Sequence, residues 1–122
     1  MKLIEQVIYD YLKAVSGVPV YLEHAPGTNG TRRIVIEKTG GGEYGALKNA
    51  TFAVQSYGLT IVAAAELNNH VKNWMKKAPQ TLEEICDVDL NSDYNFTDTE
   101  TKEYRYQAVF DLTYYPDNEV ED

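Results

Sequence analysis

Residues 104–114, YRYQAVFDLTY, decide the fold class. Every second side chain in this stretch is aromatic, aliphatic or small. These side chains are Tyr104, Tyr106, Ala108, Phe110, Leu112 and Tyr114. A period of two over this length is typical of a β-strand with one face on a core. Residues 86–91 alternate in the same way, which places Cys86, Val88 and Leu90 inward, and TDTET (97–101) supplies a turn. The last third therefore predicts a long β-hairpin.

The period is helical at the N-terminus. Leu3, Ile4, Val7, Ile8, Tyr11, Leu12 and Val15 form one apolar stripe. Strands are predicted over 18–22, where Pro19 favours an edge position, and over 33–38 and 51–57. A second helix is predicted from about Thr60, as N-cap, to Lys77, with Pro79 ending it. The order α-β-β-β-α-β-β predicts an α+β fold: a mainly antiparallel β-sheet with two α-helices packed on one face.

The length of 122 residues predicts one domain, over residues 1–116. The acidic end, 117–122, is expected to be disordered. Cys86 is the only cysteine, which fits a reducing compartment and, on the inward face of its strand, predicts a buried inert thiol. The N-terminus lacks the continuous apolar stretch of a signal peptide, and no run is long enough for a membrane span. We expect a soluble intracellular protein.

Charge is divided unevenly along the chain. Residues 1–78 carry six acids and nine bases, a net +3, whereas residues 79–122 carry thirteen acids and two bases, a net −11. An acidic surface repels nucleic acid, so tight nucleic-acid binding through the last third is excluded. The interleaved stretch KEYRYQAVF (102–110) has the residue types of a base-stacking platform, but its aromatic face is the better candidate for the core.

The stretch KTGGGEYG (38–45) raises the question of phosphate binding. A phosphate loop requires a different spacing of glycine and lysine and a following helix, whereas a strand is predicted here. Glu43 would also repel a phosphate. The glycines therefore predict a mobile loop between two strands, of the kind that often contacts partners.

Residues 87–98, DVDLNSDYNFTD, place oxygen-bearing side chains at alternate positions, as a calcium-binding EF-hand loop does. The candidate ligands are Asp87, Asp89, Asn91, Asp93, Asn95 and Asp98. Ser92 stands where that loop needs glycine, and Asp98 where it needs glutamate. Strand patterns flank the segment instead of helices. A strand with a polar outward face explains the same residues, and both interpretations stay open.

Catalytic groups do not assemble in the sequence. His24 lies in a predicted loop and His70 beside the apolar stripe of the second helix. The serines have no hydrolase motif around them. We therefore predict no enzyme activity and no cofactor.

Four passages carry a resemblance: IVIEKTGGG, ATFAVQSYG, AAELNNHVKNWM and LNSDYNFTDTETKEYRYQAVFDLTYY. With the order of elements, they make the chain similar to the tail terminator proteins of long-tailed bacteriophages and prophages, also called tail-completion or head–tail joining proteins. The resemblance implies a structural protein of the virion tail, made in the host cytoplasm. It implies a ring, commonly a hexamer, that caps the tail tube, ends its growth and meets the head connector.

The resemblance also implies where such a ring makes its contacts. Its protruding elements match two stretches by position: Gly41, Gly42, Glu43 and Tyr44, and Asn95, Thr97, Asp98 and Thr99. The implied partners are other copies, the major tail tube protein and the head completion or connector protein. We further expect part of the acidic last third to face the lumen, so that DNA passes without sticking. The alternative is a small binding module, calcium-dependent through residues 87–98.

Overall fold

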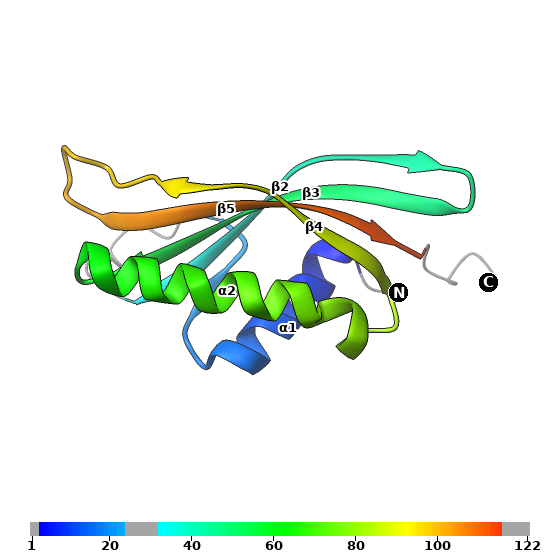
Figure 1. Cartoon of the computed structure of the whole chain (residues 1–122), viewed down its shortest axis with the longest axis horizontal. Coiled ribbons are helices and arrows are strands. Elements are labelled where there is room, and N and C mark those ends of the chain that lie inside the picture. The colour runs from blue at the N-terminus through cyan, green and yellow to red at the C-terminus, as the bar shows by residue number, and fades with distance from the viewer. Residues whose placement is uncertain (1–2, 24–31, 116–122) are drawn as a thin grey trace.

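The computed structural model describes residues 3–23 and 32–115, which form an α+β fold with the predicted order of elements (Figure 1). The two helices are α1 (Ile4–Ser16) and α2 (Ile61–Thr81). The five strands are β1 (Val20–Tyr21), β2 (Arg33–Tyr44), β3 (Leu47–Gly58), β4 (Ile85–Asn95) and β5 (Tyr104–Tyr114). Both helices lie on the same side of one sheet, as predicted. We call the opposite side of the sheet the open face.

The sheet has the order β1-β2-β3-β5-β4. The short β1 pairs in parallel with β2 at one edge, and every other pairing is antiparallel. β5 covers residues 104–114, the bounds expected from its alternation, and it pairs along its whole length with β3. The edge position expected for the strand after α1 is confirmed, although β1 has two residues instead of the five predicted.

The core lies between the sheet and the helices. Ile8 and Leu12 of α1 and Leu67, Val71 and Met75 of α2 are fully buried there. They pack against the helix-side residues of the central strands. These are Phe52, Val54, Ala108, Phe110 and Leu112. Burying each large apolar side chain stabilises the fold by about 1.5–3 kcal/mol, so the alternation of β5 directly supplies part of the core energy.

The first turn of α2 is fixed by two local features. Thr60 is the N-cap, as predicted, and its Oγ1 accepts a hydrogen bond of 3.0 Å from the backbone N–H of Ala63. Gly58 comes just before, and a Cβ added there would lie 2.5 Å from the backbone nitrogen of Ala64. Only glycine lets the end of β3 approach the helix this closely.

The prediction that Pro79 ends this helix is wrong, since α2 continues to Thr81 with Pro79 inside its last turn. Leu82 N–H still bonds to the carbonyl of Ala78 at 2.8 Å, and Thr81 Oγ1 donates to the carbonyl of Lys77 at 3.2 Å. These bonds satisfy carbonyl groups beyond the one that proline leaves without a donor.

The predicted glycine loop is also wrong. β2 runs through the glycines to Tyr44, and Gly40, Gly41 and Gly42 pair with Thr51, Ala50 and Asn49 of β3. A two-residue turn joins the strands, with Gly45 at a φ of 63° that favours glycine. The glycines stay in the ladder because β3 is itself paired to β5 on its other edge. Ladder hydrogen bonds thus offset the weak strand preference of glycine.

Two irregularities in β4 change the direction of its side chains. The register shifts between Ile85 and Asp87 and again between Leu90 and Ser92. The first shift turns Ile85 into the core and leaves Cys86 exposed, so the expectation of a buried thiol is wrong. Leu90, predicted inward, is 43% exposed, whereas Val88 is half-buried against the core.

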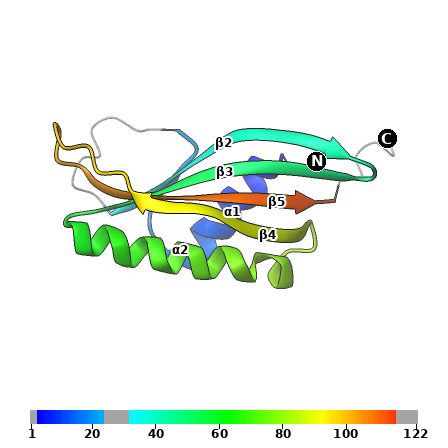
Figure 2. The same ribbon diagram turned by 45° about the horizontal axis from the view of Figure 1, so that its top comes forward.

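Two hairpins extend from opposite ends of the molecule (Figures 1 and 2). The distal part of the β2–β3 hairpin, residues 39–49, projects beyond the helices, and we call it the arm. The connection from β4 to β5, residues 96–103, forms the other end, and we call it the tip. The family resemblance implied protruding elements at both places, and the structure separates the two hairpins along the longest axis of the molecule.

Candidate interaction surface

The open face of the sheet is polar beside the arm. Two cross-strand rows run from the arm across β5 to β4, and in each row every residue stands beside its neighbour in the next strand. One row is Gly42, Asn49, Thr113 and Asp87, and the next is Gly40, Thr51, Asp111 and Asp89. No large apolar side chain occurs in either row. Among the described residues, no helix covers this part of the sheet.

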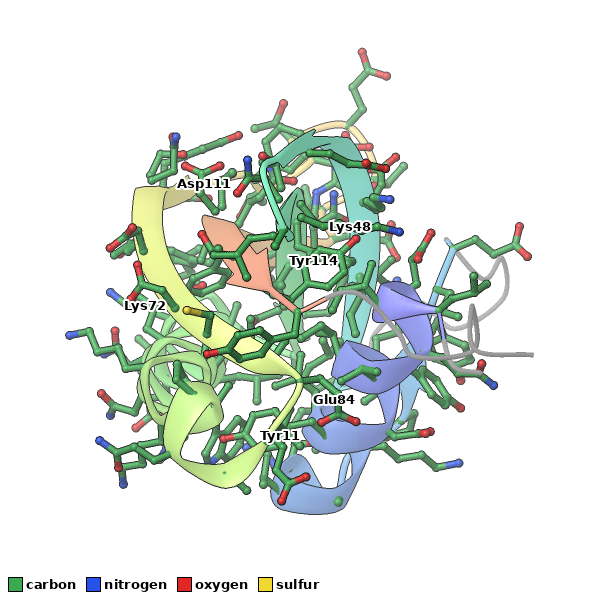
Figure 3. The ribbon with its side chains drawn as sticks, turned by 90° about the vertical axis from the view of Figure 1, so that its right-hand side faces the viewer. Tyr11, Lys48, Lys72, Glu84, Asp111 and Tyr114 are labelled. Carbon is green, nitrogen blue, oxygen red and sulfur yellow. The ribbon has the colours of Figure 1, made fainter. Side chains whose placement is uncertain are left out.

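Three carboxylates, Asp87, Asp89 and Asp111, lie close together there, and we call them the acidic patch. Figure 3, which looks at the arm end, shows Asp111 on the side of the sheet away from the helices. The negative charge of Asp87 raises the pKa of Asp89 above its usual range, and Asp111 adds to the effect. The patch is therefore a surface where like charges repel one another.

Hydrogen bonds from neighbouring strands fix the carboxylate of Asp111. Its Oδ1 accepts a bond of 2.8 Å from the hydroxyl of Thr51, and its Oδ2 accepts one of 2.9 Å from Nδ2 of Asn91. Asn91 lies at the second irregularity of β4, where its side chain turns to the open face. β3, β4 and β5 thus each contribute to holding one negative charge in place.

The other end of the open face is covered by the tip. Tyr57 is 2% exposed there because Arg33 and Arg105 enclose its ring, with the Arg33 guanidinium carbon 3.8 Å from the ring centre. Arg33 Nη2 forms an ion pair of 3.0 Å with Oε2 of Glu103 in the tip. Arg105 Nε donates to the carbonyl of Phe96 at 2.7 Å, and its guanidinium lies over the Phe96 ring.

A chain of side-chain hydrogen bonds crosses the strands from this cluster. Arg105 Nη1 donates to the hydroxyl of Tyr57 at 2.9 Å, and that hydroxyl donates to Oε1 of Gln55 at 3.1 Å. Gln55 Nε2 donates to Oε1 of Gln107 at 2.9 Å, and Gln107 Nε2 donates to the hydroxyl of Tyr94. These bonds tie β3, β5 and β4 together under the tip. Sequence reasoning missed the cluster, because only the strand register shows that these residues share one face.

The arm carries the first group of residues predicted at an interface. Gly41, Gly42 and Glu43 are exposed, and they lie in the last part of β2 together with Tyr44. The edge of β2 is paired by β1 only at Ile34 and Val35. Among the described residues, the edge of β2 beyond Val35 therefore presents its backbone groups without a partner strand.

The tip carries the second group. Asn95 ends β4, Thr97 accepts a bond from the backbone N–H of Arg105, and Thr99 is exposed at the turn. Asp98 Oδ1 accepts bonds from the backbone N–H groups of Glu100 and Thr101. These bonds lower the pKa of Asp98. The two predicted groups do not meet within one molecule, because the arm and the tip lie at opposite ends.

The candidate calcium ligands are not brought together in a wrapped loop. Asp87, Asp89, Asn91 and Asp93 lie along the extended strand β4, and Asp98 lies in the tip. Asp93 faces α2 instead, where it accepts bonds of 2.6 Å from Asn68 and 2.5 Å from Lys72. Across residues 3–23 and 32–115, no group of three or more His, Cys, Asp or Glu side chains is arranged to hold a metal ion.

The described candidate catalytic side chains, His70 and Cys86, come from different elements, α2 and β4. His70 stacks on Trp74 on α2, with the ring centres 5.5 Å apart. Cys86 lies on β4, and the hydrogen bond between its thiol and the hydroxyl of Tyr115 raises the pKa of Tyr115. His24 falls outside the described residues.

Among the described residues, a hollow lies at each end of the molecule. One, of about 450 Å³, lies against the arm, and its lining includes Lys38, Glu43, Lys48 and Tyr114. The other, of about 430 Å³, lies beneath the tip, between Arg105 and Glu37 of β2. The arm hollow faces the helix side of the sheet, because Lys48 pairs with the inward Tyr114 (Figure 3).

Neither a family model nor a curated protein matches the chain. In the part of the chain that the structure describes, no helix is long and apolar enough to cross a membrane.

Proposed function

We propose that this chain is a ring-forming subunit of a larger protein assembly. The observation that carries the proposal is the contrast between the two faces of the sheet. One face is sealed by both helices, whereas beside the arm the other exposes small polar side chains and the acidic patch. A two-layer subunit of this kind forms a wall in which the helices cover one face of the sheet and solvent covers the other.

Within that class, the assembly is the head-proximal ring of a bacteriophage tail, and the chain is its tail terminator. The similarity of the sequence to such proteins supports this role. The ring, commonly a hexamer in these proteins, ends growth of the tail tube and joins the tail to the head connector. The subunit performs no chemistry in this role, and its partners are other copies, the tube protein and the connector protein.

The acidic patch indicates whether the open face points toward the channel of the ring or away from it. DNA carries one negative charge per about 1.7 Å of its axis, so a channel lined by carboxylates repels it and prevents sticking. Asp87, Asp89 and Asp111 supply such charges on a surface without large side chains to obstruct passage. The open face therefore lines the lumen, and the helices face outward.

Deletion of the gene from its phage or prophage tests the role. We expect tails of uncontrolled length that are not joined to heads, and we expect the intact gene supplied in trans to restore complete particles. Electron microscopy of lysates measures both features. Complete virions with tails of normal length in the deletion strain would show that the chain has another function.

A further inference from the structure

The two outer edges of the sheet differ in how strongly they oppose pairing with another strand. At one edge, β4 is interrupted by two register shifts and carries the mutually repelling Asp87 and Asp89. Both features discourage edge-to-edge pairing. At the other edge, β2 beyond Val35 has no partner strand among the described residues, and its one register shift follows Lys38 (Figure 2). The edge of β2 is therefore the one that is open to an added strand.

Glycines fill the middle of this free edge without a reason inside the single chain. None of the glycines at 40–42 has a positive φ, so the backbone conformation does not require them. A Cβ at Gly40 would come no closer than 3.9 Å to a neighbour, and one at Gly42 would meet nothing within 4 Å. Glycine inside a strand often marks a place where another backbone approaches closely. A second strand along this edge would account for both residues.

Two opposite charges flank the glycines on the same face of β2. Lys38 pairs with Phe52, which lies in the core on the helix side of the sheet. Glu43 pairs with Lys48, whose neighbour on β5 is Tyr114, also packed against the core. Lys38 and Glu43 therefore both lie on the helix side, one on each side of the glycines. An edge with this arrangement is complementary to itself in antiparallel orientation.

We propose that two free copies of the chain pair through their β2 edges, antiparallel and about a two-fold axis at Gly41. The two residues at the register shift, Lys38 and Thr39, then stand opposite Glu43 of the other copy. Opposite residues of antiparallel strands share a face, so each Lys38 meets a Glu43 and two equal ion pairs form. The partner at this edge is thus a second copy of the same chain.

This paired form goes beyond the proposed ring and does not depend on it. A two-fold contact uses the same surface on both copies and therefore ends at two, whereas a ring is built from head-to-tail contacts. Pairing also covers an edge that would otherwise accept strands of other chains. The dimer is therefore a form of the free subunit, which separates before the arm takes part in any larger assembly.

Disulfide formation between two different variants tests the register. Gly40→Cys and Gly42→Cys are prepared as separate proteins, each in a Cys86→Ser background. Both positions accept a Cβ without a close contact. In the proposed register Gly40 of one copy stands opposite Gly42 of the other, within reach of a disulfide. We therefore expect mild oxidation to give a reducible dimer in the mixture and little of it in either protein alone.

A charge exchange provides an independent measurement by sedimentation over a range of concentrations. We expect the parent protein to form a dimer. Lys38→Glu replaces two ion pairs with two repulsions and should raise the dissociation constant about tenfold or more. Glu43→Lys should do the same, and the two changes in one chain should restore pairing. Lys48→Ala is the matched control, because Lys48 lies in the same hairpin but on β3, away from the free edge, and its loss should leave the dimer unchanged.

The proposal is overturned by a protein that stays monomeric at every concentration, or by a dimer whose mixed cysteine variants form no disulfide. Equal weakening by Lys48→Ala and Lys38→Glu would also overturn it, because the contact would then not follow the edge of β2. None of these results bears on the ring, which the deletion strain tests separately.

Discussion

Of the described glycines, Gly58 has the closest neighbours. An added Cβ would lie 2.5 Å from the nitrogen of Ala64 and 2.9 Å from atoms of Ala63, so either β3 or the start of α2 must move. We expect Gly58→Ala to lower the free energy of unfolding by about 1–3 kcal/mol. Urea denaturation measures this, with Gly42→Ala as the control because its Cβ meets nothing within 4 Å. Equal stability of the two variants would contradict the close approach.

Also at the residue scale, the acidic patch makes a pH prediction. Asp87 raises the pKa of Asp89, so the folded chain holds a proton there at pH values where the unfolded chain has lost it. This contribution favours the fold at low pH and is lost as pH rises through the raised pKa. Asp87→Asn should return the pKa of Asp89 toward 3.8 and make the folded state relatively more stable at neutral pH. NMR titration of the side-chain carboxyl carbon of Asp89 measures the pKa. The same pKa in the parent protein and in Asp87→Asn would refute the charge coupling.

At the scale of elements, the tip depends on a buried ion pair. The side chains of Arg33 and Glu103 are 1% and 9% exposed. Glu103→Ala removes one hydrogen-bonded partner of the buried Arg33 guanidinium, so it should lower the free energy of unfolding by about 1–3 kcal/mol. Glu100→Ala, on the same turn but exposed, is the control and should change stability by about 0.5 kcal/mol or less. Thermal and urea denaturation of both variants provide the measurement, and an equally mild effect at Glu103 would contradict the anchoring of the tip.

The elements also show what the sequence could and could not predict. The alternation of 104–114 gave the bounds of β5 and its core face, because period and burial coincide there. The alternation of 86–91 failed for Cys86, because a register shift in β4 has no local signature in the sequence. The prediction of a loop from the glycines failed at Gly40–Gly42, where tertiary pairing overrides the weak strand preference of glycine.

The candidate surfaces were predictable to different degrees. The two protruding hairpins were placed by position, and the acidity of the last third followed from composition. The grouping of Asp111 with Asp87 and Asp89 was not predictable, since it depends on the register between β4 and β5. The enclosure of Tyr57 by Arg33 and Arg105 depends on the tip folding back over the open face.

At the scale of the whole molecule, the acidic patch should affect passage of DNA and leave assembly intact. Asp87→Lys with Asp89→Lys would place positive charge on the face that we propose lines the lumen, where it would hold the DNA backbone. We expect complete particles whose infectivity falls by about tenfold or more, since fields of this kind change local concentrations and rates by at least that factor. The control is Glu83→Lys with Glu84→Lys, because these two residues are also exposed but lie in the turn before β4. Plaque counts per particle give the measurement, and equal losses in both variants would argue against a lumen-facing patch.

The central claim is that the chain forms the head-proximal ring of a tail with its open face toward the channel. Cryo-electron microscopy of assembled tails tests it directly. We predict a closed ring of copies at the head end of the tube, with Asp87, Asp89 and Asp111 lining the channel and α1 and α2 outside. A ring with the helices toward the channel and the acidic patch on its outer rim would contradict the account, as would the absence of this chain from the head end of the tail.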